Sequence, residues 1–320
     1  MAVYTEVSDQ DLRAFLDQYE LGEVTSFKGI AEGVENSNYL LRTTGGSFIL
    51  TLYEKRVRRE DLPYFLGLME HLAEQGISCP VPLRGRDGEA LRELCGRPAA
   101  IITFLDGLWP RRVMPEHCRL LGEAMAHMHL AGSSFALRRE NDLSMRGWRP
   151  LFESCAARAD EVKGGLAEGL DRELGVLETA WPASLPEGVI HADLFPDNVF
   201  FLGGRLSGII DFYFACNDFF AYDLAICLNA WCFESEITFN VTKARLLLNA
   251  YRKVRPFSES ELEALPLLAR GSALRFLLTR LYDWLHHPPG AFVEPKDPLE
   301  YWHKLRFHQD VRGPGAYGLD

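Results

Sequence analysis

The segment of residues 189–212, VIHADLFPDNVFFLGGRLSGIIDF, constrains the fold of this chain more than any other stretch. It contains short apolar runs of strand type, a polar loop and a Gly-Gly turn. His191 and Asp193 follow the first apolar run, four residues separate Asp193 from Asn198, and Asp211 ends the last run. Apolar runs joined by a glycine turn predict a hairpin. The hairpin would return Asp211 toward the loop that carries Asp193 and Asn198.

Three oxygen-bearing side chains in this segment fit the needs of phosphoryl transfer. Mg²⁺ takes hard oxygen ligands, often one or two protein groups together with phosphates, and Asp211 and Asn198 could supply those groups. The carboxylate of Asp193 could accept a hydrogen bond from an attacking hydroxyl and align it, because positioning and charge neutralisation dominate this reaction. Asp and Asn are also ordinary turn residues, so a purely structural loop is the alternative interpretation.

The order of these residues resembles the catalytic segment shared by protein kinases and the aminoglycoside phosphotransferase family. That pattern is His-x-Asp-x-x-x-x-Asn followed by an Asp on the next hairpin. Tyr213 stands where protein kinases have Gly. The Ile-Asp-Phe form of residues 210–212 and Ala192 in place of Arg resemble the small-molecule kinases. The resemblance implies an α+β, two-lobed, protein-kinase-like fold that uses ATP and Mg²⁺. It also implies catalytic roles for Asp193, Asn198 and His191, and a metal site at Asn198 and Asp211.

The two lobes are expected to divide at Asp106, where an apolar run of residues 99–105 ends. Residues 1–106 would form a small antiparallel-sheet N-lobe that binds the nucleotide, and residues 107–320 a larger, mainly helical C-lobe for catalysis and substrate binding. The resemblance places a phosphate-covering loop between strands at 24–30 and 37–42. The loop residues expected to bind the nucleotide are Gly29, Gly33, Asn36, Ser37 and Asn38. A Gly/Asn-rich hairpin turn is the alternative there.

Other expected nucleotide contacts in the N-lobe follow from the same resemblance. The end of the apolar run would bond the adenine edge through the backbone of Thr103, Phe104 and Leu105. Glu70, on a helix predicted at 59–75, would orient a phosphate-binding lysine, although a solvated surface charge explains it equally well. Thr51 occupies the position where many relatives have that lysine, which leaves Lys28 and Lys55 as weak substitutes.

The second half of the chain reads as helical. Helices are predicted at 115–131, within 149–181, from about 217 onward, at 241–254 and at 258–285, followed by an irregular, Pro- and Gly-rich tail. His127 and His129 lie two positions apart and so point to different sides of a helix, which favours structural roles over a metal pair. The resemblance assigns Asp223 to bracing the catalytic loop.

Composition narrows the class of protein. A formal net charge of −11 and a pI near 5.4 argue against a large nucleic-acid footprint, which needs clustered Lys and Arg. Seven scattered cysteines without a Cys-x-x-Cys pair favour free thiols in a reducing compartment. The acidic N-terminus lacks a signal-peptide pattern, and no apolar run is long enough to span a bilayer. We therefore expect a cytoplasmic protein, monomeric or homodimeric, without membrane or nucleic-acid partners.

Within the family, several stretches resemble the bacterial homoserine kinases. They are residues 33–39, 48–54, 104–107, 191–200 and 211–214. The resemblance implies the small-molecule acceptor L-homoserine, a zwitterion that needs an acid for its ammonium and a cation for its carboxylate. Candidates are Asp218, Arg275 and Arg280. The alternatives are another alcohol kinase of this fold, acting on choline, methylthioribose or an aminoglycoside, a non-catalytic nucleotide-binding protein, or a metal-dependent hydrolase.

Overall fold

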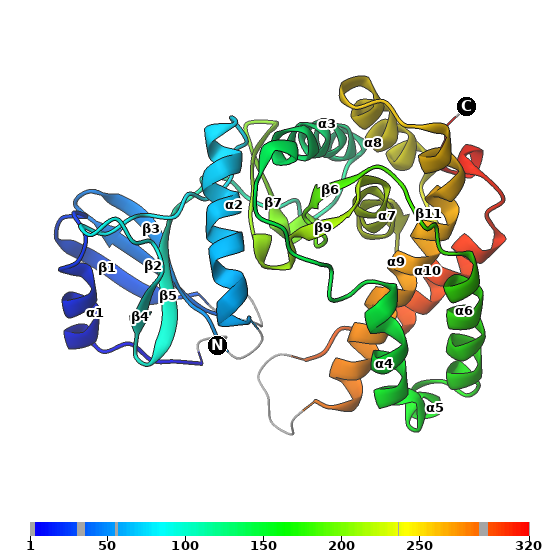
Figure 1. The fold of residues 1–320 in the computed structure, drawn as a ribbon, viewed down its shortest axis with the longest axis horizontal. Coiled ribbons are helices and arrows are strands. Elements are labelled where there is room, and N and C mark those ends of the chain that lie inside the picture. Colours follow the sequence, from blue (N-terminus) through cyan, green and yellow to red (C-terminus); the bar gives the residue numbers. More distant parts are fainter. Residues whose placement is uncertain (1–3, 31–35, 55–56, 236, 288–293, 320) are drawn as a thin grey trace. The chain divides into compact units, whose positions relative to one another are not determined.

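The computed structural model describes residues 4–30, 36–54, 57–235, 237–287 and 294–319. The chain divides into two compact units (Figure 1). Unit 1 comprises Met1–Gly107 and Ser207–Tyr213, and unit 2 comprises Leu108–Leu206 and Phe214–Asp320. The chain thus leaves the first unit next to the predicted boundary at Asp106. Ser207–Tyr213, which the sequence analysis placed in the second domain, groups with unit 1 and carries Asp211 into it.

Unit 1 is built on a five-stranded antiparallel sheet in the order β1-β2-β3-β5-β4. Its elements are α1 (Asp9–Leu16), β1 (Val24–Gly29), β2 (Ser37–Thr43), β3 (Gly46–Leu52), the 3₁₀ turn Arg59–Asp61, α2 (Leu62–Glu74), β4 (Arg92–Leu94) and β5 (Arg97–Thr103). Alternation along β2 and β3 directs Tyr39, Leu41 and Leu50 to one face. Leu12 and Phe15 of α1 pack into the same cluster, so α1 covers that face.

Unit 2 is mainly helical. Its helices are α3 (Pro115–Ala131), α4 (Met145–Ala156), α5 (Ala159–Val162), α6 (Leu166–Ala180), α7 (Phe220–Trp231), α8 (Val241–Val254), α9 (Glu259–Leu285) and α10 (Leu299–Asp310). Its short strands are β6 (Glu187–Ile190), β7 (Val199–Leu202), β9 (Cys216–Phe219), β10 (Phe233–Glu234) and β11 (Thr238–Phe239), and β8 (Arg205–Ile209), which pairs with β7, runs from unit 2 into unit 1. Unit 2 also contains the 3₁₀ turns Gly132–Ser134, Pro196–Asn198 and Pro314–Tyr317, and the 3₁₀ turn Phe212–Phe214 begins in unit 1 and ends in unit 2.

The core of unit 2 forms where α7 packs on α9, and α9 packs on α10. Nearly every residue of α7 is buried, including the polar residues Asp223 and Asn229, so this helix packs against other parts of the unit on all sides. The close approach of α3 to α8 depends on Gly122, because a Cβ atom there would lie 2.1 Å from the backbone oxygen of Leu247.

Two elements differ from the sequence-based predictions. The strand β9 occupies residues predicted to begin a helix, because it pairs antiparallel with β6 and α7 starts only at Phe220. The tail predicted to be irregular contains the helix α10. Its buried residues Tyr301, Lys304, Leu305 and His308 follow helical spacing, but two of the four are polar. An apolar stripe therefore does not mark this helix.

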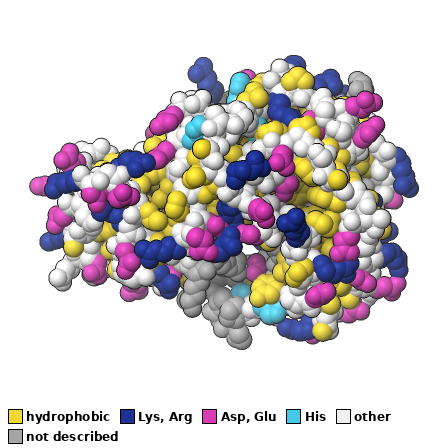
Figure 2. Space-filling view, viewed as in Figure 1, with side chains coloured by type: hydrophobic (Ala, Val, Ile, Leu, Met, Phe, Trp, Pro, Cys, Tyr) yellow, Lys and Arg dark blue, Asp and Glu magenta, His cyan; other side chains and the backbone are white. Residues whose placement is uncertain are grey.

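The charged side chains on the surface and the state of the cysteines agree with what the composition led us to expect. Figure 2 shows basic and acidic side chains interspersed over the visible face. All seven cysteines are free, and all but Cys95 are buried, which confirms the prediction of scattered thiols. Among the helices of the described residues, none combines the length and the apolar character that a membrane span requires.

His308 on α10 should make the stability of the protein depend on pH. Its ring is fully buried: Nε2 donates to the amide oxygen of Asn229 (3.2 Å) and Nδ1 accepts from the hydroxyl of Tyr317 (2.8 Å). Burial, with help from the positive charges of Lys304 and Arg270, lowers the pKa of His308 to about 3. The unfolded chain then binds this proton at a higher pH than the folded chain does.

Stability should accordingly fall as the pH drops from the ordinary His pKa of about 6.5 toward 3. The urea midpoint at pH 7 and pH 5 measures this loss. His308→Gln should be less stable at pH 7 but should lose less on acidification than the unmodified protein. His127→Gln, at an exposed position of α3, is the matched control and should leave the pH dependence unchanged. An unaltered pH dependence in the His308 variant would contradict this assignment.

Candidate active site

The loop after β6 carries the proposed base and is held in an unusual backbone conformation. Ala192 has φ = 63° and Asp211 has φ = 65°. Non-glycine residues in this left-handed region cost of order 1–3 kcal/mol and cluster at functional sites. Of the four described non-glycine residues with positive φ, two thus lie in the segment that the sequence analysis singled out.

Asp223 at the start of α7 holds this loop. Its carboxylate accepts the backbone N–H groups of His191 (3.0 Å) and Ala192 (2.9 Å), and His129 Nε2 lies 3.0 Å from Oδ2. His129 Nδ1 is 2.7 Å from the hydroxyl of Tyr251. Burial alone would raise the pKa of Asp223, but the bond from His129 and the contacts with His191 hold this pKa below its ordinary value. The arrangement matches the bracing role expected for Asp223 and gives His129 a structural role.

The side chain of His191 has a role inside the loop. It is fully buried, and its Nδ1 accepts the backbone N–H of Asp193 at 3.3 Å. These contacts let His191 position Asp193, and the catalytic role expected from the resemblance stays a prediction.

Asp193 and Asn198 come together as the spacing predicts. Asn198 Nδ2 donates to the backbone oxygen of Asp193 (2.8 Å) and to its Oδ2 (3.2 Å). Both bonds use the amide N–H groups of Asn198. Its amide oxygen, the atom that would bind a magnesium ion, takes part in neither bond. The side chain of Asp193 is 19% exposed, and Arg275 Nη1 lies 3.7 Å from its Oδ1.

The electrostatic surroundings of Asp193 suit a base. Burial raises the pKa of Asp193, and the positive charge of Arg275 opposes the rise. A carboxylate with a raised pKa binds a proton more tightly than one in water, which favours proton transfer from an alcohol.

In unit 1, Asp211 precedes a buried aromatic cluster. The hydroxyl of Tyr213 lies 3.1 Å from that of Tyr53, and its ring packs edge-on against Phe65 with centroids 5.8 Å apart. Burial raises the pKa of Tyr213 to about 12, so its hydroxyl stays protonated at neutral pH. Tyr213, at the position of glycine in protein kinases, therefore has a packing role that the sequence analysis did not assign.

The expected phosphate loop is described only in part. Gly33 lies outside the described residues, and Gly29 is an exposed residue at the end of β1. Ser37 is fully buried, and its hydroxyl donates to Glu54 (2.8 Å) and accepts the backbone N–H groups of Tyr4 and Thr5. This hydroxyl fixes the N-terminal segment and is committed within the fold.

The two asparagines of this loop also make internal bonds. Asn36 Oδ1 accepts the backbone N–H of Glu54 (3.3 Å), and Asn38 Oδ1 accepts the hydroxyl of Thr51 (2.8 Å). Thr51, in the position of the usual lysine, thus links β3 to β2. Neither bond uses the amide N–H groups of the asparagines, so these donors fit a phosphate ligand.

The other nucleotide candidates lie at or beyond the end of the sheet. The pairing of β5 with β3 ends at Thr103, and Phe104 and Leu105 follow it. The carboxylate of Glu70 pairs with Arg84 at 2.6 Å on the surface, which favours the surface-charge alternative over a lysine partner. Lys28 is exposed on β1, and Lys55 lies outside the described residues.

The three acceptor candidates have different surroundings. Asp218 accepts Asn141 Nδ2 and the N–H of Phe219, both at 2.7 Å, and burial raises its pKa. Arg280 pairs with Glu300 and donates to the backbone oxygen of Asp297, so its charge is neutralised. Of the two arginines, Arg275 is the one recorded beside Asp193.

Comparison with known proteins agrees with this geometry. The profile of the family described as phosphotransferase enzyme family matches residues 26–257. The chain belongs to this family. It is 65% identical to the homoserine kinase of Paramagnetospirillum magneticum over the full length of both, and 68% identical to that of Bradyrhizobium diazoefficiens over all of this chain and 98% of the relative. Enzymatic phosphotransfer, predicted from the residues at 191–211, is thereby confirmed.

A solved structure confirms the predicted fold class. The amicoumacin kinase hAmiN, described in complex with AMP-PNP, Ca²⁺ and Ami, superposes with a TM-score of 0.68. The match covers 95% of this chain and 92% of that one at 16% identity. At this identity the likeness concerns the fold, with its antiparallel sheet and larger helical part.

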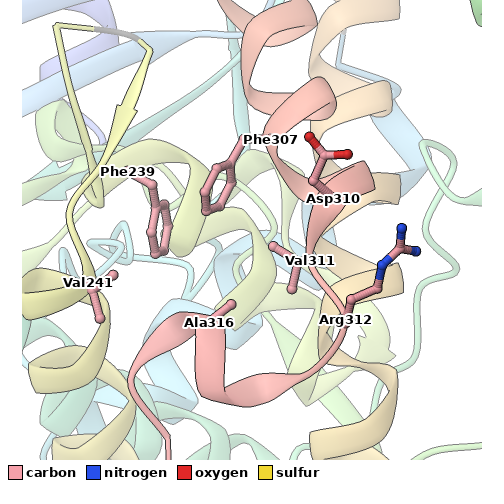
Figure 3. A pocket seen from close by; sticks show the side chains of 7 residues that line it. All are labelled: Phe239, Val241, Phe307, Asp310, Val311, Arg312 and Ala316. Atoms are coloured by element: carbon pink, nitrogen blue, oxygen red, sulfur yellow. The ribbon is translucent and has the colours of Figure 1, made fainter.

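A separate pocket in unit 2 contains none of the predicted site residues. It has a volume of about 300 Å³ (Figure 3) and is lined by Phe239, Val241, Phe307, Asp310, Val311, Arg312 and Ala316. The rings of Phe239 and Phe307 stack with centroids 4.6 Å apart.

Proposed function

We propose that this phosphotransferase transfers the γ-phosphoryl group of ATP to the side-chain hydroxyl of L-homoserine and forms O-phospho-L-homoserine, a step of threonine biosynthesis. The observation that carries the acceptor is the full-length similarity to proteins named homoserine kinase, at 65–68% identity in two of them. The geometry at Asp193 and Asn198 supports the chemistry. The free, mostly buried thiols are consistent with a cytoplasmic location.

In this mechanism Asp193 accepts the hydrogen bond of the acceptor hydroxyl and takes its proton as the oxygen attacks phosphorus. Asn198 fixes the carboxylate through Oδ2 and the loop through the backbone oxygen. The amide oxygen of Asn198 and the carboxylate of Asp211 each have the hard-donor chemistry that Mg²⁺ prefers, so each residue could supply a ligand to it. Bound Mg²⁺ would neutralise charge on the phosphates.

One observation separates L-homoserine from some of the alternative acceptors. The guanidinium of Arg275 is buried and lies 3.7 Å from Asp193 Oδ1, so a positive charge lies beside the base. Choline and the aminoglycosides carry no anionic group that could pair with this cation, whereas L-homoserine carries a carboxylate. An acceptor with an anionic group would be attracted.

An acceptor panel tests the proposal. Enzyme with Mg-ATP is mixed separately with L-homoserine, choline, methylthioribose and an aminoglycoside, and ADP release is recorded with a coupled assay. L-Homoserine should stimulate ADP release well above the rate with water as acceptor, and phosphorus NMR should detect a phosphomonoester. If L-homoserine gives no stimulation and another alcohol does, the acceptor is wrongly assigned.

A further inference from the structure

Of the buried polar atoms of unit 2 that have no hydrogen-bond partner among the described residues, four belong to three helices that pack together. They are Tyr222 Oη on α7, Ser272 Oγ and Arg275 Nη1 on α9, and Tyr301 Oη on α10. Buried polar atoms without partners are rare in folded proteins, and each one calls for an explanation such as a ligand or an ordered water. We call these four residues the orphan cluster.

Contacts place Arg275 beside the proposed base and link Arg275 to Tyr301. Arg275 Nη1 lies 3.7 Å from Asp193 Oδ1, beyond hydrogen-bond distance. The guanidinium stacks on Phe276 at 3.7 Å, and the ring of Phe276 contacts that of Tyr301 with centroids 5.3 Å apart. Ser272 precedes Arg275 by three residues, so both lie on one side of α9.

Electrostatics agrees with this placement. Burial raises the pKa of Tyr222 and of Tyr301, and the positive charge of Arg275 opposes both rises. The charge of Asp193 also acts on Tyr301. Both phenols therefore stay protonated at neutral pH and can donate hydrogen bonds to an anion.

The donor set has a clear chemical match. A guanidinium N–H with hydroxyl donors around it suits a carboxylate, which accepts several hydrogen bonds through two oxygens. Arg275 is 4% exposed, so its charge is shielded from water, and burying a cation without a full complement of bonds is costly. A bound carboxylate would remove that cost.

We infer that Arg275, with Tyr222, Ser272 and Tyr301, binds the carboxylate of the acceptor and so selects short hydroxy acids of the amino-acid type. The inference rests on the proposed function and names the contacts that set its specificity. The nearness of Arg275 to Asp193 requires the carboxylate to lie only a few carbon atoms from the reacting hydroxyl. Arg280, the other arginine considered, is already paired with Glu300.

The unmodified enzyme provides the first test, with 3-amino-1-propanol as the probe. This alcohol has the carbon chain and amine of L-homoserine but lacks the carboxylate. A site built to bond a particular substrate group strongly rejects an analogue that lacks this group. The kcat/KM for 3-amino-1-propanol should therefore be lower than that for L-homoserine by a factor of about 100 or more. Equal kcat/KM values for the two acceptors would overturn the inference.

The second test uses Arg275→Met and Arg275→Lys, with Arg172→Met on the exposed side of α6 as the matched control. Arg275→Met should raise the KM for L-homoserine and bring its kcat/KM down to the level of 3-amino-1-propanol. Arg275→Lys should keep part of the preference for L-homoserine over 3-amino-1-propanol. Arg172→Met should keep all of this preference. Circular dichroism and the melting temperature report whether each variant folds. The first test uses the unmodified enzyme and so does not depend on the folding of any variant.

The outcomes separate the two proposals. If Arg275 only adjusted the charge at Asp193, its loss would change kcat for both acceptors equally and the preference for L-homoserine would persist. That result would overturn the carboxylate site and leave the proposed function standing. Absence of any phosphorylation of L-homoserine by the unmodified enzyme would overturn the proposed function itself, and the carboxylate site with it.

Discussion

Asp193→Asn should lower kcat for L-homoserine phosphorylation by about 10²- to 10⁴-fold, the usual contribution of a general base. Asparagine has nearly the same size and still bonds to its neighbours, but it takes no proton from the acceptor hydroxyl. The carboxylate is held by Asn198 through Oδ2, so the geometry at this position should survive the change. The measurement is kcat for ADP formation at saturating ATP and L-homoserine.

The matched control is Asp197→Asn, which makes the same chemical change in the same loop. Asp197 is exposed in the 3₁₀ turn Pro196–Asn198, and its negative charge contributes to the raised pKa of Asp193. This variant should keep kcat close to that of the unmodified enzyme. Turnover by Asp193→Asn equal to that of Asp197→Asn would show that another group accepts the proton.

The loop at Asp193 could be predicted because its information is local. His191, Asp193 and Asn198 lie within eight residues, and the bonds among them close within the same loop. Sequence spacing therefore fixes which side chains meet. The brace from Asp223 comes from a different element, and only the family resemblance led to it.

The helix α10 could not be predicted for the opposite reason. Lys304 and His308 lie on its buried face, and their polar groups are satisfied by Glu300, Asn229 and Tyr317. Three-dimensional contacts, and not an apolar stripe, stabilise this helix.

Missing α10 also left the two arginines of α9 indistinguishable in the sequence. Arg275 and Arg280 lie five residues apart on the same helix, and both could serve a carboxylate. Glu300 on α10 neutralises Arg280, whereas Tyr301, the next residue, contributes to the orphan cluster around Arg275. The identity of the arginine that remains available is thus decided by a helix that sequence patterns did not reveal.

Removing the carboxylate of Asp223, which holds the catalytic loop, should have a large effect on stability. Asp223→Asn should lower the free energy of unfolding by about 3–5 kcal/mol, as expected when one partner of a buried, charge-assisted network is removed. The carboxylate accepts bonds from two backbone N–H groups and from His129. An amide presents an NH₂ group toward one of these donors, so at least one buried N–H loses its acceptor.

Urea denaturation followed by circular dichroism measures this loss, with Asp171→Asn as the control. Asp171 is an exposed carboxylate paired with Arg149, and losing such a surface pair should cost under about 1 kcal/mol. Because Asp223 also holds Ala192 in its left-handed conformation, the folded fraction of the Asp223 variant should turn over more slowly as well. A variant as stable and as active as Asp171→Asn would mean that the loop keeps its shape without the brace, and that the backbone conformation at Ala192 is fixed by the strands β6 and β7 on either side.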